Sequence, residues 1–406
     1  MIKKVLWINL LVAVGLVFLG STAMAQSAGS GLQLSIHGFV EMDVIHDNTT
    51  LGVISKAGAV PEYNTEPGQL LFVPENTRID FTALDTIDGW KTKGYLESDF
   101  FGPNNGLRIR HAFLSASKDG WLFLAGQWWT LFGWNMDYIP PTVSEEPIPG
   151  MLYDRTPQVR VMNTQDLNGA KLQIAVAAND PEQAMSQIPD FNAGVRLIID
   201  GWKGIYNPGT SPANPHPLSV GISGTFRSYG YDALTGINVN PTKTLQASGI
   251  AVDTLIPIIP ANPGSCSLVF TGEYTTGKGY GADALSEDMV PATTSLDGSL
   301  SSGVAGLING TLTLLNVESW NGVLQFHFPK QMGTELEAGY GAVYSNNAAE
   351  MTGAVFNKDY VAWANIMQNL NAHMRLGLEF LHYQTHYVNN TNPTDDRQQL
   401  TFWYYF

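Results

Sequence analysis

Two arginines stand two residues apart in a segment that alternates between charged and apolar residues. Arg108 and Arg110 alternate there with Leu107 and Ile109. In a β-strand, side chains two residues apart point to the same face and lie about 7 Å apart. A guanidinium group can bind a carboxylate through two parallel hydrogen bonds. The spacing therefore predicts a ladder of cationic groups that could guide anions along one face of a strand.

Other alternating segments place charges on the same polar face. We expect this face to line a water-filled passage, because rings of charged side chains select ions in channels. Our hypothesis is that Arg78, Arg108, Arg110 and Arg160 guide anions past a facing acidic cluster. The further side chains expected to line the passage are Asp80, Glu97, Asp99, Arg155 and Arg375.

A second interpretation of the same arginines stays open. Arginines on a channel wall can pair with acidic side chains of a neighbouring strand and brace the wall without contacting a solute. The candidate pairs are Arg78 with Asp80, and Arg108 or Arg110 with Glu97 or Asp99.

His111 interrupts the alternation, because its position places it on the apolar face beside Arg110. Either His111 lies near a membrane interface, or a β-bulge shifts the strand there.

Residues 129–154 form a long connection that is rich in aromatic residues and proline. We expect this third long loop to fold into the lumen, where its proline residues would stiffen it. Acidic side chains at a constriction would temper an anion preference. The candidate constriction residues are Asp137, Tyr138, Glu145 and Glu146. The alternative is an ordinary surface loop.

The elements that must position these residues are β-strands, because period-2 alternation recurs along the chain. Residues 35–44, 76–84, 335–344 and 396–406 each have one apolar, aromatic-rich face and one polar or glycine-rich face. A soluble β-sandwich would bury the apolar faces between two sheets. A membrane β-barrel would turn them toward lipid.

The connections favour the barrel. Asp88-Gly89, Asp119-Gly120, Asn168-Gly169 and Asp200-Gly201 are dipeptides typical of tight hairpins. Much longer connections, such as 47–75, lie between them. Short turns at one end and long loops at the other are characteristic of outer-membrane barrels.

The strand count supports the same fold class, an all-β transmembrane antiparallel barrel. An odd number of strands would leave the two termini on opposite sides of the membrane. Treating residues 308–317 as part of a long loop (277–319) leaves sixteen strands. The connections 202–216 and 256–266 are long for turns at the periplasmic end. The expected strands are 32–46, 76–86, 90–101, 106–118, 120–128, 155–165, 169–177, 191–201, 217–229, 245–255, 267–276, 320–329, 333–345, 358–369, 372–387 and 396–406.

The amino terminus predicts export. Lys3 and Lys4 precede an apolar run over residues 5–19, and Ala23 and Ala25 form a small-x-small site. These are the features of a secretory signal peptide. The run is shorter than the roughly 20 residues that a spanning helix needs. We therefore expect residues 1–25 to be a signal peptide and residues 26–406 to form the barrel.

Composition excludes several other classes of protein. The net charge of −15 argues against a nucleic-acid partner, and the single cysteine excludes a disulfide framework. His382 and His386 are four residues apart, which on a strand is about 13 Å and does not suit a metal site. We find no catalytic motif, so we expect no enzyme activity, metal or cofactor.

The chain also resembles known proteins in two places. The alternate aromatic residues Phe402, Tyr404 and Phe406 resemble the C-terminal assembly signal of bacterial outer-membrane proteins. Residues 38–160 resemble the DcaP-like family of outer-membrane porins. The matching segments are Gly38-Phe39-Val40-Glu41-Met42-Asp43, Asn76-Thr77-Arg78-Ile79-Asp80-Phe81, Tyr95-Leu96-Glu97-Ser98-Asp99-Phe100-Phe101-Gly102, Leu107-Arg108-Ile109-Arg110-His111-Ala112-Phe113, Ala125-Gly126-Gln127-Trp128-Trp129 and Arg155-Thr156-Pro157-Gln158-Val159-Arg160.

This resemblance implies a trimeric, sixteen-stranded channel for small, mostly anionic solutes such as dicarboxylates, in the outer membrane of a Gram-negative bacterium. Some members of the family carry an N-terminal coiled coil; only about six residues separate Gln26 from the first expected strand, so we expect no such segment here. We expect lipid and lipopolysaccharide around the barrel, where acidic outer-loop residues such as Asp47 and Asp395 could bind divalent ions. Two alternatives remain: a barrel with an adhesive, structural or enzymatic role, and a secreted β-sandwich that binds carbohydrate.

Overall fold

The computed structural model describes residues 31–406, apart from residues 50, 52–58, 64–66, 135–137, 140–141, 145–148, 182–185, 187, 207–213, 232–242, 263, 282, 285–288 and 291–302. The predicted signal peptide, residues 1–25, lies outside this part of the chain. Among the described residues, no helix has the length and hydropathy needed to cross a membrane.

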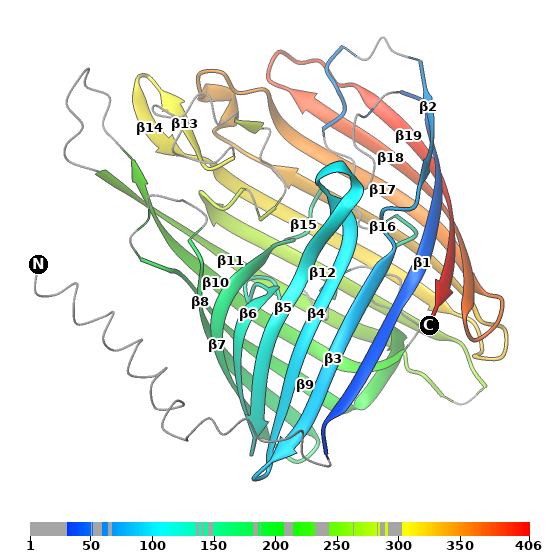
Figure 1. Cartoon of the computed structure of the whole chain (residues 1–406). Coiled ribbons are helices and arrows are strands. Elements are labelled where there is room, and N and C mark those ends of the chain that lie inside the picture. Colours follow the sequence, from blue (N-terminus) through cyan, green and yellow to red (C-terminus); the bar gives the residue numbers. More distant parts are fainter. Residues whose placement is uncertain are drawn as a thin grey trace, which may run out of the picture.

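The described strands form one closed antiparallel sheet and one separate hairpin (Figure 1). The strands are β1 (Gln33–Asp47), β2 (Gln69–Val73), β3 (Arg78–Ile87), β4 (Trp90–Gly102), β5 (Gly106–Lys118), β6 (Trp121–Trp129), β7 (Arg155–Asp166), β8 (Ala170–Asn179), β9 (Asp190–Tyr206), β10 (Asn214–Tyr231), β11 (Lys243–Ile259), β12 (Ser267–Lys278), β13 (Ala305–Ile308), β14 (Thr311–Leu314), β15 (Asn316–His327), β16 (Thr334–Tyr344), β17 (Phe356–Asn369), β18 (Met374–Tyr387) and β19 (Thr394–Tyr405). Most strands of the barrel pair with the next strand along the chain, β12 pairs with β15, and the last strand, β19, pairs with the first. Short 3₁₀ turns lie at Pro103–Asn105 (η1) and Ala348–Glu350 (η4).

The seventeen strands of the large sheet occupy sixteen positions around the barrel. β2 pairs with residues 43–47 of β1, and β3 pairs with residues 33–39 of the same strand. A turn closed by the Thr77 N–H and the Pro74 carbonyl separates β2 from β3. The two short strands therefore act as one wall position, which confirms the predicted number of sixteen.

Residues 308–317, which the sequence analysis treats as part of a long loop, belong largely to such a loop. This loop contains a short β-hairpin. β13 and β14 pair only with each other and form a hairpin at the rim, and the next barrel strand begins at Asn316. The hairpin is drawn in yellow near the top of Figure 1.

The seam between the two ends of the chain closes the barrel. Residues 39–47 of β1 pair with residues 405–397 of β19. Backbone hydrogen bonds in both directions join Gly38 and Phe406, at 3.2 and 3.1 Å. The sheet therefore has no free edge here, and the β-sandwich alternative is wrong.

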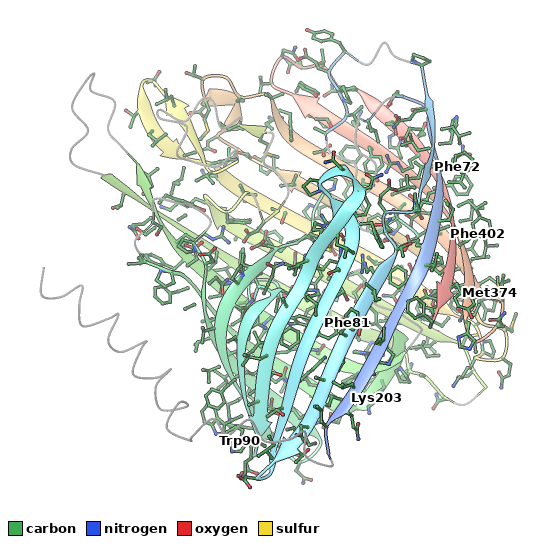
Figure 2. All side chains as sticks on the ribbon, viewed as in Figure 1. Phe72, Phe81, Trp90, Lys203, Met374 and Phe402 are labelled. Carbon is green, nitrogen blue, oxygen red and sulfur yellow. The ribbon has the colours of Figure 1, made fainter. Side chains whose placement is uncertain are left out.

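The two faces of the sheet differ in polarity as the alternation predicts. Apolar side chains such as Leu34, Phe81 and Phe402 point outward and are 74%, 45% and 47% exposed. Their neighbours Trp403 and Thr401 point inward and are buried. Figure 2 shows Phe72, Phe81, Met374 and Phe402 on the outside of the wall. This arrangement suits a barrel in a lipid bilayer.

Three of the four predicted tight turns are present. Asp88-Gly89, Asp119-Gly120 and Asn168-Gly169 all have positive φ angles, as a type I′ hairpin turn requires. The fourth prediction is wrong, because Asp200-Gly201 lies inside β9. The register between β9 and β10 shifts between Pro217 and Leu218, which face Lys203 and Ile199, so this dipeptide forms a bulge.

That bulge lengthens the neighbouring strands and shortens the connections. β9 extends to Tyr206 and β10 begins at Asn214, so the connection that the sequence places at 202–216 is residues 207–213. β11 extends to Ile259, which reduces the other long connection to 260–266. Both lengths then suit the end of the barrel that carries the short turns.

Candidate functional site

The third long loop lies inside the barrel, as predicted. Its described residues Leu131, Phe132 and Leu152 are buried against inward-facing strand residues. The Gly133 N–H donates to the hydroxyl of Ser223 on β10 at 2.9 Å. The amide of Asn321 on β15 donates to the Gly150 carbonyl at 3.1 Å. The loop therefore crosses the lumen to reach the strands opposite its own.

Two carboxylates of the wall hold this loop by accepting hydrogen bonds from its backbone. Glu379 on β18 accepts from the N–H groups of Val143 and Ser144, each at 3.0 Å, and from the Ser144 hydroxyl at 2.6 Å. Glu273 on β12 accepts from the Leu152 N–H at 2.6 Å. Hydrogen bonds from N–H groups to a carboxylate are stronger than those to a neutral acceptor, so these two side chains hold the loop firmly against the wall.

Glycine residues in the wall let an aromatic side chain of the loop approach closely. A Cβ atom added at Gly194 or Gly221 would lie 2.9 Å from the ring of Trp134. Trp134 thus packs closely against β9 and β10 at these glycines, where a Cβ atom would force the ring to shift.

The in-folded loop makes the two halves of the lumen wall different. Inward-facing carboxylates on the far half, including Asp253, Glu273, Glu337 and Glu379, are buried beneath the loop. Inward-facing residues of β3–β7, such as Asp80, Lys93, Tyr95 and Arg160, are only half-buried. The surface of the lumen that water reaches is therefore mainly the β3–β7 half, which we call the open wall.

An ion-pair network on the open wall contains four of the predicted residues. Arg108 binds Asp99 through two hydrogen bonds of 3.0 and 2.5 Å. Arg110 bridges Glu97 at 2.9 Å and Asp99 at 3.0 Å. The side chain of Arg110 is 2% exposed, whereas that of Arg108 is 40% exposed. Arg110 therefore has the geometry of the bracing interpretation, while Arg108 also faces water.

A β-bulge lies at Arg110, although Arg108 and Arg110 still share the inward face and both donate to Asp99. Glu97 pairs with His111, while the next residue, Ser98, pairs with Ile109. The extra residue turns His111 inward, where it is buried and its ring lies 4.2 Å from that of Trp128. Of the two explanations for His111, the bulge is correct and the apolar-face position is wrong.

The other predicted arginines lie in different surroundings. The guanidinium of Arg160 donates to the Gln158 side chain and to the Trp129 carbonyl, at 2.9 and 2.6 Å. The guanidinium of Arg155 lies 5.0 Å from the centre of the Trp129 ring. Arg78 stands over Phe39 at 5.4 Å.

Asp80 and Arg375 complete the predicted set. Asp80 lies 3.6 Å from His37. Arg375 on β18 is buried in an ion pair with Glu335 on β16. Its ion pair therefore has the geometry of the bracing interpretation.

Of the predicted constriction residues, only Tyr138 is described. Its ring is buried, its hydroxyl donates to Ser219 at 3.2 Å, and the guanidinium of Arg196 lies 5.3 Å from the ring centre. Tyr138 thus anchors the loop to β10. Asp137, Glu145 and Glu146 lie outside the described residues.

Sequence reasoning missed Lys93 and the aromatic residues beside it. Lys93 Nζ lies 4.4 Å from the centre of the Tyr95 ring. Lys93 and Tyr95 have the same strand parity as Glu97 and Asp99, so the alternation already placed them on the inward face. Glu273 and Glu379 were missed as loop anchors, and no local signal marks them.

A half-buried acidic group lies where the loop rejoins the wall. Asp154 directly precedes β7, and burial together with the carboxylate of Asp283 raises its pKa to about 7. The guanidinium groups of Arg227 and Arg155 oppose this effect. Arg227 itself binds Asp283 at 2.5 Å.

Two acidic residues assigned to outer loops belong to strands instead. Asp47 ends β1 and forms a buried ion pair with Arg397 at 2.6 Å. Asp395 lies in β19 and accepts from the Thr49 N–H at 2.9 Å. Both carboxylates are thus engaged within the protein, so the prediction that they bind divalent ions at the surface is wrong for them.

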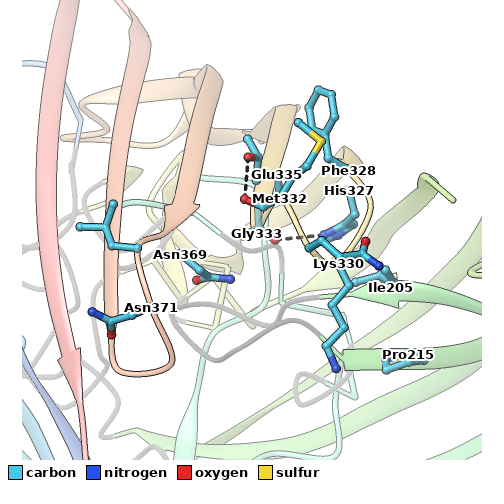
Figure 3. A pocket seen from close by; sticks show the side chains of 13 residues that line it. Ile205, Pro215, His327, Phe328, Lys330, Met332, Gly333, Glu335, Asn369 and Asn371 are labelled. Atoms are coloured by element: carbon cyan, nitrogen blue, oxygen red, sulfur yellow. Dashed lines mark hydrogen bonds and ion pairs between the residues drawn. The ribbon is translucent and has the colours of Figure 1, made fainter. Parts of the chain in front are cut away.

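A cavity of about 560 Å³ opens near the turns that join β15 to β16 and β17 to β18 (Figure 3). Its lining includes Lys330, Asn369 and Asn371, together with the His327–Glu335 pair at 3.0 Å. The cavity belongs to the end of the barrel that carries the short turns. Within the part of the chain that the structure describes, no group of three or more His, Cys, Asp or Glu side chains is placed to hold a metal ion.

Comparisons of sequence and of structure give different results. No protein-family profile matches the chain, and no curated protein matches its sequence. The fold is similar to that of the outer membrane channel DcaP of Acinetobacter baumannii, with a TM-score of 0.66 and 19% identity over 94% of this chain and 99% of that one.

Two further solved structures share the fold. An anion-selective porin from Comamonas acidovorans has a TM-score of 0.55 and 11% identity over 92% of this chain and 100% of that one. The trimer form of OmpT, an outer membrane protein of Vibrio cholerae, has a TM-score of 0.54 and 10% identity over 93% and 100%. This chain therefore has the sixteen-stranded barrel fold of the outer-membrane porins, and its likeness to DcaP confirms the resemblance seen in its sequence at the level of the fold.

Proposed function

We propose that this protein is an outer-membrane porin through which small hydrophilic solutes diffuse passively, with a preference for anions such as dicarboxylates. One observation carries the proposal. The open wall presents guanidinium and ammonium groups to the lumen, whereas the carboxylates of the opposite half are buried beneath the in-folded loop.

The burial of these carboxylates explains how a chain with a negative net charge can provide a path for anions. The net charge of the chain is −15, yet Glu273 and Glu379 are occupied by backbone N–H groups of the loop. On the open wall, Lys93, Arg155 and Arg160 add positive charge to a network in which two arginines meet two carboxylates. A solute that follows the open wall therefore meets an excess of cations.

The location and assembly rest on likeness of fold. Porin structures of the same fold support an outer-membrane location, and the trimer form named for OmpT supports a homotrimer here. Lipid and lipopolysaccharide would then surround the outward apolar face. No catalytic role is proposed, since the open wall carries charged and aromatic groups without a nucleophile-and-base arrangement among its described residues.

Reversal potentials test the anion preference. The protein is inserted into a planar bilayer with a KCl gradient, and a potential of the sign for chloride-selective transport is expected. Arg108→Gln should shift the potential toward cation selectivity, because Asp99 loses its bidentate partner. The double variant Arg108→Gln/Asp99→Asn removes both charges and should return the potential toward the original value.

A cation-selective wild type would contradict the proposal. Liposome swelling then ranks the solutes: dicarboxylates should enter faster than neutral sugars of similar size, and equal rates would remove dicarboxylates from the proposal.

A further inference from the structure

The open wall carries a second feature below the arginine network, toward the short-turn end of β4–β6. Three aromatic rings meet there, and one ammonium group lies near two of them. We call Lys93, Tyr95, Phe113 and Trp128 the aromatic cradle. Lys93 and Tyr95 come from β4, Phe113 from β5 and Trp128 from β6.

The rings of the cradle are arranged as a continuous apolar surface. The ring centres of Tyr95 and Phe113 lie 5.4 Å apart, and Phe113 and Trp128 meet edge to face at 4.6 Å. Trp128 also meets Tyr95 at 5.9 Å with an interplanar angle of 84°. All three are half-buried, so part of each ring faces the lumen.

Lys93 places a positive charge at the edge of this surface. Its Nζ lies 4.4 Å from the Tyr95 ring centre and 5.5 Å from that of Phe113. Among the described residues, no carboxylate lies within ion-pair distance of Nζ, and the side chain is half-buried. The acidic groups that influence it from farther away are Asp80 and Glu97.

Those two carboxylates are engaged with other groups. Asp80 faces His37, and Glu97 binds Arg110 and accepts from the Tyr95 hydroxyl at 2.9 Å. The ammonium group of Lys93 therefore remains available to an anion, while the rings beside it remain available to an apolar body.

A ring-bearing anion matches this combination. An aromatic ring gains from edge-to-face and offset contacts with Phe113 and Trp128, and a carboxylate gains from a half-buried ammonium group. Leu84 of β3, which pairs with Lys93 and is 41% exposed, extends the apolar surface beside the cradle. A small aliphatic anion would use only the charge.

We propose that the aromatic cradle is a binding subsite for aromatic carboxylates on their way through the lumen. The proposal rests on the proposed porin function and names a class of solute for it. The cradle and the arginine network lie next to each other along β4 and β5, so a solute that follows the open wall would meet both.

Single-channel current in a planar bilayer tests the proposal, with benzoate and propionate as the probes. Both probes carry one carboxylate, and only benzoate carries a ring. We expect benzoate to interrupt the current at a concentration about threefold to tenfold lower than propionate, as one or two aromatic contacts imply. Trp128→Leu should lower this ratio toward one, and Trp128→Phe should retain it.

Matched variants separate the cradle from general effects. Lys93→Met should weaken the block by both probes, whereas Lys91→Met, which removes an exposed lysine from the same face of β4, should not. Trp121→Leu alters the outward face of β6, where Trp121 is 48% exposed, and should leave the ratio unchanged. Gel migration before and after boiling verifies that each variant is folded.

Equal block by benzoate and propionate in the wild type would overturn the proposal, as would a ratio that survives Trp128→Leu. Failure of the porin function is distinguishable, because it appears as a missing conductance or a cation-selective reversal potential. An anion-selective channel that does not discriminate between the probes would refute the cradle alone.

Discussion

Ser144 and Glu379 are joined by two hydrogen bonds, although 235 positions separate them in the chain. The Oε1 atom of Glu379 accepts both the backbone N–H and the hydroxyl of Ser144, at 3.0 and 2.6 Å. The other carboxylate oxygen accepts from Val143 and from the Asn365 amide, at 3.0 and 2.8 Å. This side chain therefore fixes the middle of the in-folded loop against β18.

Replacing this anchor should loosen the loop. Glu379→Ala removes the acceptor of three loop hydrogen bonds, which should destabilise the docked loop by about 2–4 kcal/mol. We expect a larger and noisier single-channel conductance than in the wild type. Glu318→Gln changes an exposed residue of β15 and serves as the control. Identical conductance in the wild type and Glu379→Ala would show that the loop is held elsewhere.

The two arginines of the network should respond differently to mutation. Arg110→Ala removes one ion-pair partner of the buried Asp99 carboxylate. The variant should lose about 3–5 kcal/mol of stability. Arg108→Ala removes a side chain that is 40% exposed and should cost less. The temperature at which the detergent-solubilised barrel opens, read from gel migration, measures both. Equal losses of stability in the two variants would mean that the burial of Arg110 does not make its ion pairs more important than those of Arg108.

Asp154 should make stability depend on pH near neutrality. Its pKa is raised from 3.8 to about 7 in the folded protein, so the folded state disfavours its charge. Well below its unfolded-state pKa of 3.8, the group is protonated whether the protein is folded or not, and it then has no effect on stability. As the pH rises from 4 to 7, the unfolded state ionises first, and folded stability is lost.

Asp154→Asn should therefore stabilise the barrel by about 1 kcal/mol at pH 8 and have little effect at pH 4. Opening temperatures at the two pH values measure the difference, with Asp88→Asn in an exposed turn as the control. A gain that is larger at pH 4 would contradict the raised pKa.

The contact of Trp134 with the wall can be tested by two substitutions on one strand. Gly194→Ala places a Cβ atom 2.9 Å from the Trp134 ring and should displace it, at a cost of about 1–3 kcal/mol. Gly201→Ala, also in β9, meets no atom within 4 Å and should be tolerated. Opening temperature and conductance report on stability and loop position. Equal tolerance of both substitutions would show that Trp134 does not need the open face of Gly194.

Much of the barrel could be predicted from alternation alone. Parity places Arg108, Asp99 and Phe402 on the correct faces, because each strand has one wet and one apolar side. Parity fails at His111 and at Asp200-Gly201, where a bulge depends on the pairing of two strands and not on the sequence of one. The same limit hides Glu379, since nothing near it in sequence indicates a loop 235 positions away.

The seam between Gly38 and Phe406 has a consequence for biogenesis. The first strand finds one of its two neighbours only among the last residues of the chain, so the cylinder cannot be completed while synthesis or export is under way. A chain that ends before β19 would enter the bilayer with two unpaired strand edges. Lipid hydrocarbon cannot hydrogen-bond to the backbone groups at these edges. Truncation before β19 should therefore yield an unstable polypeptide and no narrower channel.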